Sequence, residues 1–115
     1  MGLLKMLHDP EMNKWAQQKA VEVLNSIPSQ DLILEAYLFG SAVDGNFTDD
    51  SDLDFVVVTK DHASIKQLQK EVYTRRFAEF GIAIDWIFKT KESFDERKNF
   101  GGVCFVAFRD GKRLR

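Results

Sequence analysis

The chain has 115 residues, of which 44% are hydrophobic and 12% aromatic, a composition typical of a folded domain and not of a disordered chain. Its net charge of −2 argues against direct binding of nucleic acid, whose protein partners are usually basic, and no apolar run is long enough to span a membrane. This length predicts one domain over residues 1–115. The single cysteine, Cys104, excludes an internal disulfide, which suits a reducing compartment, so we expect the protein in the cytoplasm. Cys104 lies in an apolar run, and we expect it in the core.

The first half of the chain predicts a helix and two strands. The helix covers residues 10–27, with Asp9 as its N-cap and Pro28 as its end. Its apolar stripe consists of Met12, Ala16, Ala20, Val23 and Ile27. Residues 32–39 and residues 52–59 are predicted strands joined by a turn-rich segment. The second of them is apolar on both faces in its middle, which indicates a central strand covered on both sides.

The second half predicts a helix over residues 64–80, ended by Gly81, then a strand over residues 82–88. The inner face of this helix is marked by Ile65, Leu68, Val72 and either Tyr73 or Arg76. A short helix over residues 92–98 and a fourth strand over residues 103–109 follow. The order of these elements predicts an α+β domain, with a mixed β-sheet flanked by helices.

Asp52 and Asp54 stand at the start of the second predicted strand. Residues two apart in a strand point to the same face, with Cα atoms roughly 6.5–7 Å apart, so the two carboxylates form a clamp suited to hard divalent cations. The spacing alone is weak, because in a chain this rich in aspartate about one such pair is expected by chance. Asp50 and Asp52 make a second pair, and an acidic turn that caps a strand explains either pair equally well.

A third carboxylate, Asp85, interrupts an otherwise apolar predicted strand, where aspartate is disfavoured. The alternation of the strand places Asp85 on the face opposite Trp86. If this strand lies beside the one that carries Asp52 and Asp54, three carboxylates meet, and bound cations would relieve their repulsion. The alternative is an aspartate at a partly exposed edge or paired with a basic side chain.

Gly40 and Ser41 end the first predicted strand. Glycine allows a phosphate to approach the backbone closely, and Ser41 offers a hydroxyl and a backbone N–H, at the start of a short helix if one forms there. A simple strand-ending turn is the alternative.

Taken together, Gly40-Ser41, ten residues, and Asp52-Leu53-Asp54 form a pattern that resembles the signature of the DNA polymerase beta-like nucleotidyltransferase superfamily, and in particular its minimal nucleotidyltransferases. Asp85 occupies the position of the third carboxylate of that family. The resemblance has one departure, because relatives often carry a basic residue in the turn where this chain has Asp44.

The resemblance implies an enzyme that transfers a nucleoside monophosphate from an NTP, by analogy ATP, to an acceptor hydroxyl. Asp52, Asp54 and Asp85 would be its catalytic residues and would bind two Mg²⁺ ions, with Asp85 on the acceptor side and able to take the proton. Gly40 and Ser41 would bind the β- and γ-phosphates of the nucleotide.

The acceptor is not encoded in the motif. Minimal nucleotidyltransferases resemble one half of toxin–antitoxin pairs, in which they can AMPylate a tyrosine of a HEPN-domain partner protein, and we take this as the leading hypothesis. Two alternatives stay open. One is an antitoxin that acts by contact alone, without catalysis, and the other is a transferase for a small hydroxyl compound such as an aminoglycoside.

Overall fold

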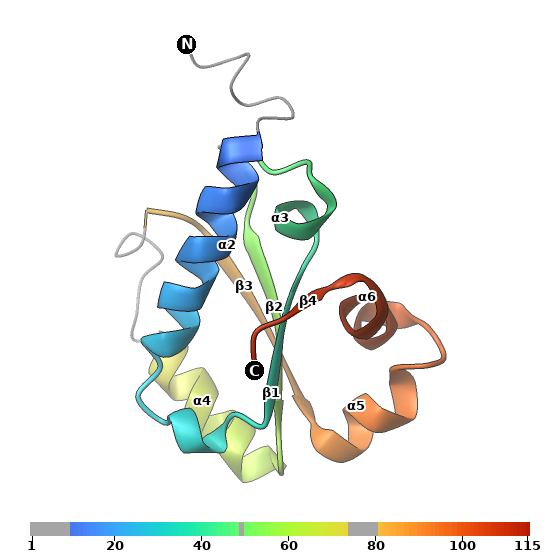
Figure 1. Cartoon of the computed structure of the whole chain (residues 1–115). Coiled ribbons are helices and arrows are strands. Elements are labelled where there is room, and N and C mark those ends of the chain that lie inside the picture. The colour runs from blue at the N-terminus through green and yellow to red at the C-terminus, as the bar shows by residue number, and fades with distance from the viewer. Residues whose placement is uncertain (1–9, 49, 74–80) are drawn as a thin grey trace.

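The computed structural model describes residues 10–48, 50–73 and 81–115 (Figure 1). Four strands form one mixed sheet in the order β3-β2-β1-β4. Strand β1 pairs antiparallel with both β2 and β4, whereas β2 and β3 are parallel. The strands are β1 Glu35–Phe39, β2 Leu53–Thr59, β3 Ile84–Thr90 and β4 Lys112–Arg113. The predicted fold class, a mixed sheet flanked by helices, is confirmed.

Helices α2, Pro10–Asn25, and α4, His62–Tyr73, cover one face of the sheet (Figure 1). Helix α2 begins at Pro10, as predicted, because proline is favoured in the first helical position. It ends at Asn25, earlier than predicted, and Ile27 is buried just beyond it. The apolar stripe of α2 packs on side chains of β2 in one core cluster, whose members include Ala16, Ala20, Val23, Leu53, Phe55 and Val57.

Helix α4 starts two residues before the predicted Ser64. The Oδ1 atom of Asp61 accepts a hydrogen bond from the backbone N–H of Ser64 at 2.9 Å, so Asp61 acts as the N-cap. Leu68 and Val72 are buried as predicted, whereas Tyr73 is 80% exposed and does not belong to the inner face. The remainder of the predicted helix, residues 74–80 with Arg76, lies outside the described residues.

Helices α5, Lys91–Arg97, and α6, Gly102–Asp110, cover the opposite face (Figure 1). They pack on a second core cluster that includes Val56 and Val58 of β2. Cys104 is buried in this cluster and carries a free thiol, so its predicted place in the core is confirmed. Among the described residues, no helix combines the length and the apolar character that a membrane span requires.

The predicted strand over residues 103–109 is wrong, because this segment forms α6. Its buried residues are Cys104 and Ala107, which are three apart as on one face of a helix, whereas Val106 and Phe108 are each 41% exposed. The β-branched and aromatic residues of the segment favour a strand, but packing on the sheet overrides this preference. The fourth strand is instead the short β4, directly after Gly111.

The other strands deviate from prediction mainly at their ends. A short 3₁₀ helix, η1 Gln30–Leu32, precedes β1, which is therefore shorter than the predicted residues 32–39. Strand β3 starts two residues later than the predicted residues 82–88. The central position predicted for β2 is confirmed, since β2 lies between β1 and β3 and residues 55–58 have no exposed surface.

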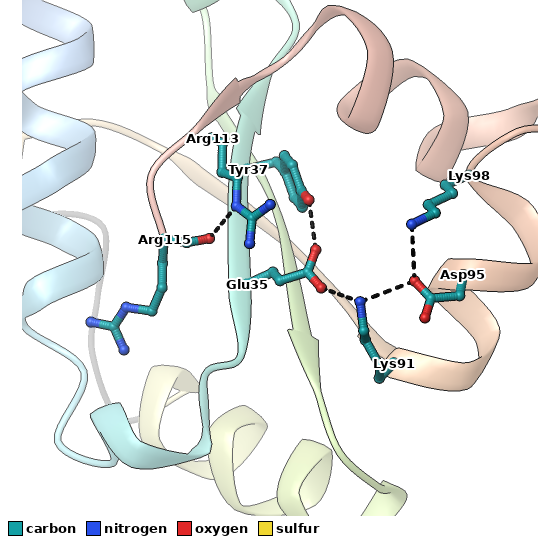
Figure 2. Close-up of polar contacts among 7 residues, drawn as sticks. All are labelled: Glu35, Tyr37, Lys91, Asp95, Lys98, Arg113 and Arg115. Atoms are coloured by element: carbon teal, nitrogen blue, oxygen red, sulfur yellow. Dashed lines mark hydrogen bonds and ion pairs between the residues drawn. The ribbon is translucent and has the colours of Figure 1, made fainter.

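A polar network ties β1 to α5 (Figure 2). The buried carboxylate of Glu35 accepts a hydrogen bond from the Tyr37 hydroxyl at 2.6 Å and another from Lys91. Lys91 also donates to Asp95 at 3.1 Å. Burial alone would raise the pKa of Glu35, but the hydrogen bonds from Lys91 and Tyr37 outweigh it and lower that pKa below its ordinary value.

We predict that Glu35→Gln lowers the free energy of unfolding at pH 7 by about 1–3 kcal/mol, because Lys91 and Tyr37 lose a charged acceptor. A lowered carboxylate pKa stabilises the fold above the unfolded pKa, so this difference should shrink as the pH falls below about 4. Urea denaturation of the native chain and of the variant, at pH 7 and below pH ~4, measures this difference in the free energy of unfolding. The control is Glu22→Gln, which removes an exposed ion pair with Lys19 and should change stability little. Equal losses at both positions would contradict a special role for Glu35.

Candidate active site

The segments that carry the predicted site residues lie at one end of the sheet, the upper end in Figure 1. Strand β1 ends there, and because β2 is antiparallel to β1 and parallel to β3, both β2 and β3 begin there. In the register of the sheet, Phe39 lies opposite Asp54, and Asp54 lies opposite Asp85. The sheet therefore places Gly40, Asp54 and Asp85 in a row across three neighbouring strands.

Asp54 and Asp85 are direct neighbours on one face of the sheet. Strand alternation puts Asp54 on the same face as Val56 and Val58, which pack under α5 and α6. Trp86 and Phe88 pack on the other side, in the cluster under α2 and α4. Asp85 is thus on the face opposite Trp86, as its sequence pattern predicts, and it is solvent-exposed, whereas Asp54 is half-buried.

The pKa of Asp54 is raised to about 6. Its largest cause is burial, and the negative charges of Asp85 and Asp52 add to it. Within the described ranges, no hydrogen bond or ion pair neutralises the Asp54 carboxylate. A bound cation would lower this pKa again, so the electrostatics of Asp54 suit a metal ligand.

Asp52 lies directly before β2, with its side chain exposed. Of the residues that the structure describes, no three His, Cys, Asp or Glu side chains come close enough together to hold a metal ion. The sheet thus brings Asp54 and Asp85 together, but the predicted meeting of all three carboxylates is not preformed. The two facing carboxylates fit a hard divalent cation, and Asp52 is the third oxygen donor next to them.

The Gly40-Ser41 turn packs directly against Asp54. Gly40 has a φ of 80°, and a Cβ atom added to it would lie 2.5 Å from Oδ2 of Asp54. The positive φ favours glycine at position 40, and a side chain there would displace the Asp54 carboxylate. The short helix α3, Ser41–Asp44, begins at this turn, as the sequence had allowed. Any group bound to the backbone of Gly40 and Ser41 lies next to Asp54.

Two residues that the sequence did not single out hold α3 in place. The Nδ2 atom of Asn13 donates to the carbonyl oxygen of Ala42 at 2.8 Å, and Nε2 of Gln17 donates to the same oxygen at 2.9 Å. Both come from α2, one turn apart. Their only sequence signal is that two amides share one side of an amphipathic helix, which does not reveal a contact so far along the chain.

Asp44, which departs from the basic residue of the pattern, has a local role. Its Oδ1 atom accepts a hydrogen bond from the backbone N–H of Asn46 at 3.2 Å. This contact closes the turn around Gly45, whose φ is 95°. Asp44 therefore shapes the end of α3 rather than the side of the turn that faces Asp54.

Comparison with known proteins gives three findings. The family model described as "Nucleotidyltransferase domain" matches residues 18–109. A solved structure of a Sulfolobus solfataricus protein assigned as a nucleotidyltransferase is similar, with a TM-score of 0.61 and 20% identity over 98% of this chain and 91% of that one. A chain of the toxin–antitoxin complex MntA-HpeT is also similar, with a TM-score of 0.52 and 16% identity over 86% of this chain and 72% of that one. That complex was solved as a variant in which two aspartates, two positions apart, are replaced by glutamate. No curated protein matches the sequence.

We predict that Asp54→Asn stabilises the metal-free protein at pH 8, because the neutral amide removes a desolvated charge that Asp85 and Asp52 repel. The gain should be on the order of 1 kcal/mol, since half-exposure screens the repulsion. Urea denaturation in EDTA measures it.

The control for that measurement is Asp31→Asn at an exposed position, which should change stability by less than about 0.5 kcal/mol. A destabilised Asp54→Asn variant would show that the carboxylate is a structural hydrogen-bond acceptor and not a strained ligand.

Proposed function

The chain belongs to the nucleotidyltransferase domain family, whose model matches most of its length, and on this premise we propose that it transfers AMP from ATP to a tyrosine hydroxyl of a partner protein. The family, the enzyme class and the fold predicted from the Gly-Ser and Asp-x-Asp pattern are thereby confirmed. The donor, the acceptor, the metal ions and the cytoplasmic location remain predictions.

One observation carries the assignment of the site, namely the register that places Asp54 opposite Asp85 while Gly40 contacts Asp54. A carboxylate pair next to a glycine turn is what a triphosphate with divalent cations requires. Negative ligands hold the cations, and backbone without a side chain leaves room for the phosphates. Neither feature serves the stability of the fold, because the carboxylates repel each other and Gly40 has a positive φ.

Two Mg²⁺ ions held by Asp52, Asp54 and Asp85 would supply the charge that neutralises the triphosphate and lowers the pKa of the acceptor hydroxyl. The residues of the chain position the reactants around that charge. Gly40 and Ser41 bind the β- and γ-phosphates on the β1 side. Asp85, on the β3 side, accepts the proton of the acceptor hydroxyl. The hydroxyl oxygen bonds to the α-phosphorus while the bond from that phosphorus to the bridging oxygen breaks, and pyrophosphate leaves with the electron pair.

The partner is proposed to be a HEPN-domain toxin, with this chain as its antitoxin. The resemblance to minimal nucleotidyltransferases supports this role, and so does the similarity of fold to a chain of the MntA-HpeT complex. The two aspartates replaced in that complex have the same spacing as Asp52 and Asp54, which fits a function for such a pair in that protein.

We predict that Asp52→Asn reduces AMP transfer to a co-expressed HEPN-type partner by at least about 100-fold, because a metal ligand is lost without any change in the core. Intact-mass spectrometry of the partner, incubated with Mg²⁺ and ATP, counts the added AMP groups. Asp52 is exposed, so thermal unfolding should be unchanged.

Asp50→Asn is the matched control, because Asp50 belongs to the other Asp-x-Asp pair but lies in the turn before β2 and should retain transfer. Transfer that survives Asp52→Asn would refute the assignment. Full silencing of the partner by the inactive variant would favour the antitoxin that acts by contact alone.

A further inference from the structure

Helix α3, which follows Gly40, is too short to fix its own conformation. It has four residues, Ser41–Asp44, and isolated helices of this length are not stable in water. Glycines with a positive φ stand at both ends, Gly40 at 80° and Gly45 at 95°, and no side chain caps the start of the helix. Contacts with the rest of the fold must therefore fix the backbone of Gly40 and Ser41, to which the β- and γ-phosphates are assigned.

Two side-chain amides of α2, which lies beside α3 in Figure 1, supply such contacts. The Nδ2 atom of Asn13 donates to two successive carbonyl oxygens, that of Ser41 at 3.3 Å and that of Ala42 at 2.8 Å. Nε2 of Gln17 donates to the same Ala42 oxygen at 2.9 Å. The last carbonyl groups of a helix have no partner within it, so the amides bind acceptors that α3 itself does not use. Helix α3 is thus anchored on α2 through its backbone.

The amides reach α3 from the face of the sheet that α2 covers. Asp54 lies on the other face, which α5 and α6 cover, and Gly40 contacts it from the end of β1. Asn13 and Gln17 are therefore on the side of the sheet away from a nucleotide bound beside Asp54. Their effect on that nucleotide passes through the turn that they hold.

The ammonium group of Lys112 determines which way the Gln17 amide points. Strand β4 pairs with β1 so that Lys112 lies opposite Leu38, two residues before Gly40. Its Nζ atom donates to Oε1 of Gln17 at 3.0 Å. Because an ammonium group can only donate hydrogen bonds, it binds the amide oxygen and directs the amide NH₂ group to the Ala42 carbonyl. Hydrogen bonds linked in this way polarise and strengthen one another.

We propose that Asn13, Gln17 and Lys112 are positioning residues of the donor site, the part of the candidate site that binds the nucleotide. They hold the Gly40-Ser41 turn in the form that receives the β- and γ-phosphates, without touching the nucleotide. The inference rests on the proposed function and adds to it a contribution from β4. Position 17 requires an amide, because one side chain must accept from Lys112 and donate to the Ala42 carbonyl, which a glutamate carboxylate cannot do.

The first test replaces this amide by a carboxylate of the same shape. Gln17→Glu keeps the acceptor for Lys112 but loses the donor to Ala42. Isothermal titration calorimetry with Mg²⁺ and α,β-methylene-ATP, which cannot transfer AMP, should show an affinity at least about fivefold lower, as expected for one lost hydrogen bond. Gln18→Glu is the matched control, because Gln18 is exposed on the same helix and should keep the affinity within about twofold. Equal affinities of the two variants would overturn the proposal.

Backbone amide signals in NMR spectra report the turn itself. In the nucleotide-free chain, Gln17→Glu should shift the N–H signals of Ser41 and Ala42, and Gln18→Glu should leave both in place. A glutamine that only stabilises the fold would, on replacement, lower the midpoint of thermal unfolding and leave the nucleotide affinity of the folded protein unchanged. That result would contradict a positioning role.

The second test asks whether Lys112 acts through Gln17. Lys112→Met should lower the affinity for α,β-methylene-ATP by at least about threefold in the native chain, and by less than about 1.5-fold in the Gln17→Met background. Lys112→Arg still donates and should keep the affinity within about twofold. Lys66→Met, at an exposed position of α4, controls for the lost charge. Equal losses in the two backgrounds would show that Lys112 acts independently of Gln17 and would overturn its positioning role.

The outcomes separate this inference from the proposed function. A native chain that does not bind α,β-methylene-ATP, or binds it without a shift of the Gly40 and Ser41 signals, overturns the donor site on which the inference rests. Binding that shifts these signals but is unchanged by Gln17→Glu leaves the proposed function standing and overturns the positioning role. A KM for ATP that rises in Gln17→Glu, with the KM for the partner within about twofold, supports both.

Discussion

The parallel pairing of β2 with β3 is the constraint on which the rest of the structure depends, because it forces Asp54 and Asp85 together. The repulsion between them is tolerated because residues 53 and 55–58 of β2 are completely buried. Burial of a large apolar side chain stabilises a fold by about 1.5–3 kcal/mol, so five such residues outweigh the cost of one carboxylate with a raised pKa. The hydrophobic core thus holds Asp54 and Asp85 side by side in spite of the repulsion between their carboxylates.

The two faces of the sheet have different roles, since one supports the helix next to the site and the other carries the Glu35 network. On one face, α2 contributes apolar residues to the core and, from its adjacent side, the amides of Asn13 and Gln17 that hold α3. On the other face, the buried Glu35 and its partner Lys91 fix the start of α5 far from the carboxylates. The Glu35 network and the candidate site therefore use different residues at opposite ends of the sheet.

The site could be predicted from the sequence where its geometry is local. The spacing from Gly40 to Asp54 spans the one connection, including α3, between two paired strands, and the alternation around Asp85 shows its face directly. The register that sets Asp54 opposite Asp85 could not be predicted, because α4 and its connections separate the two strands. The segment that forms α6 was misread because its apolar residues satisfy both periodicities, and only the burial of Cys104 with Ala107 distinguishes them.

The missing basic residue of the Gly-Ser turn shows how a contact made by a distant segment can change the meaning of a local pattern. Asp44 accepts a hydrogen bond from the backbone of Asn46 and thereby completes the turn. A positive charge reaches the neighbourhood of α3 from the far end of the chain, because β4 pairs with β1 and Lys112 donates a hydrogen bond to Gln17 at 3.0 Å. Gln17 also donates a hydrogen bond to the carbonyl oxygen of Ala42, so the ammonium group of Lys112 is linked to the turn through α2. The sequence of the turn alone therefore underestimates the positive charge around it.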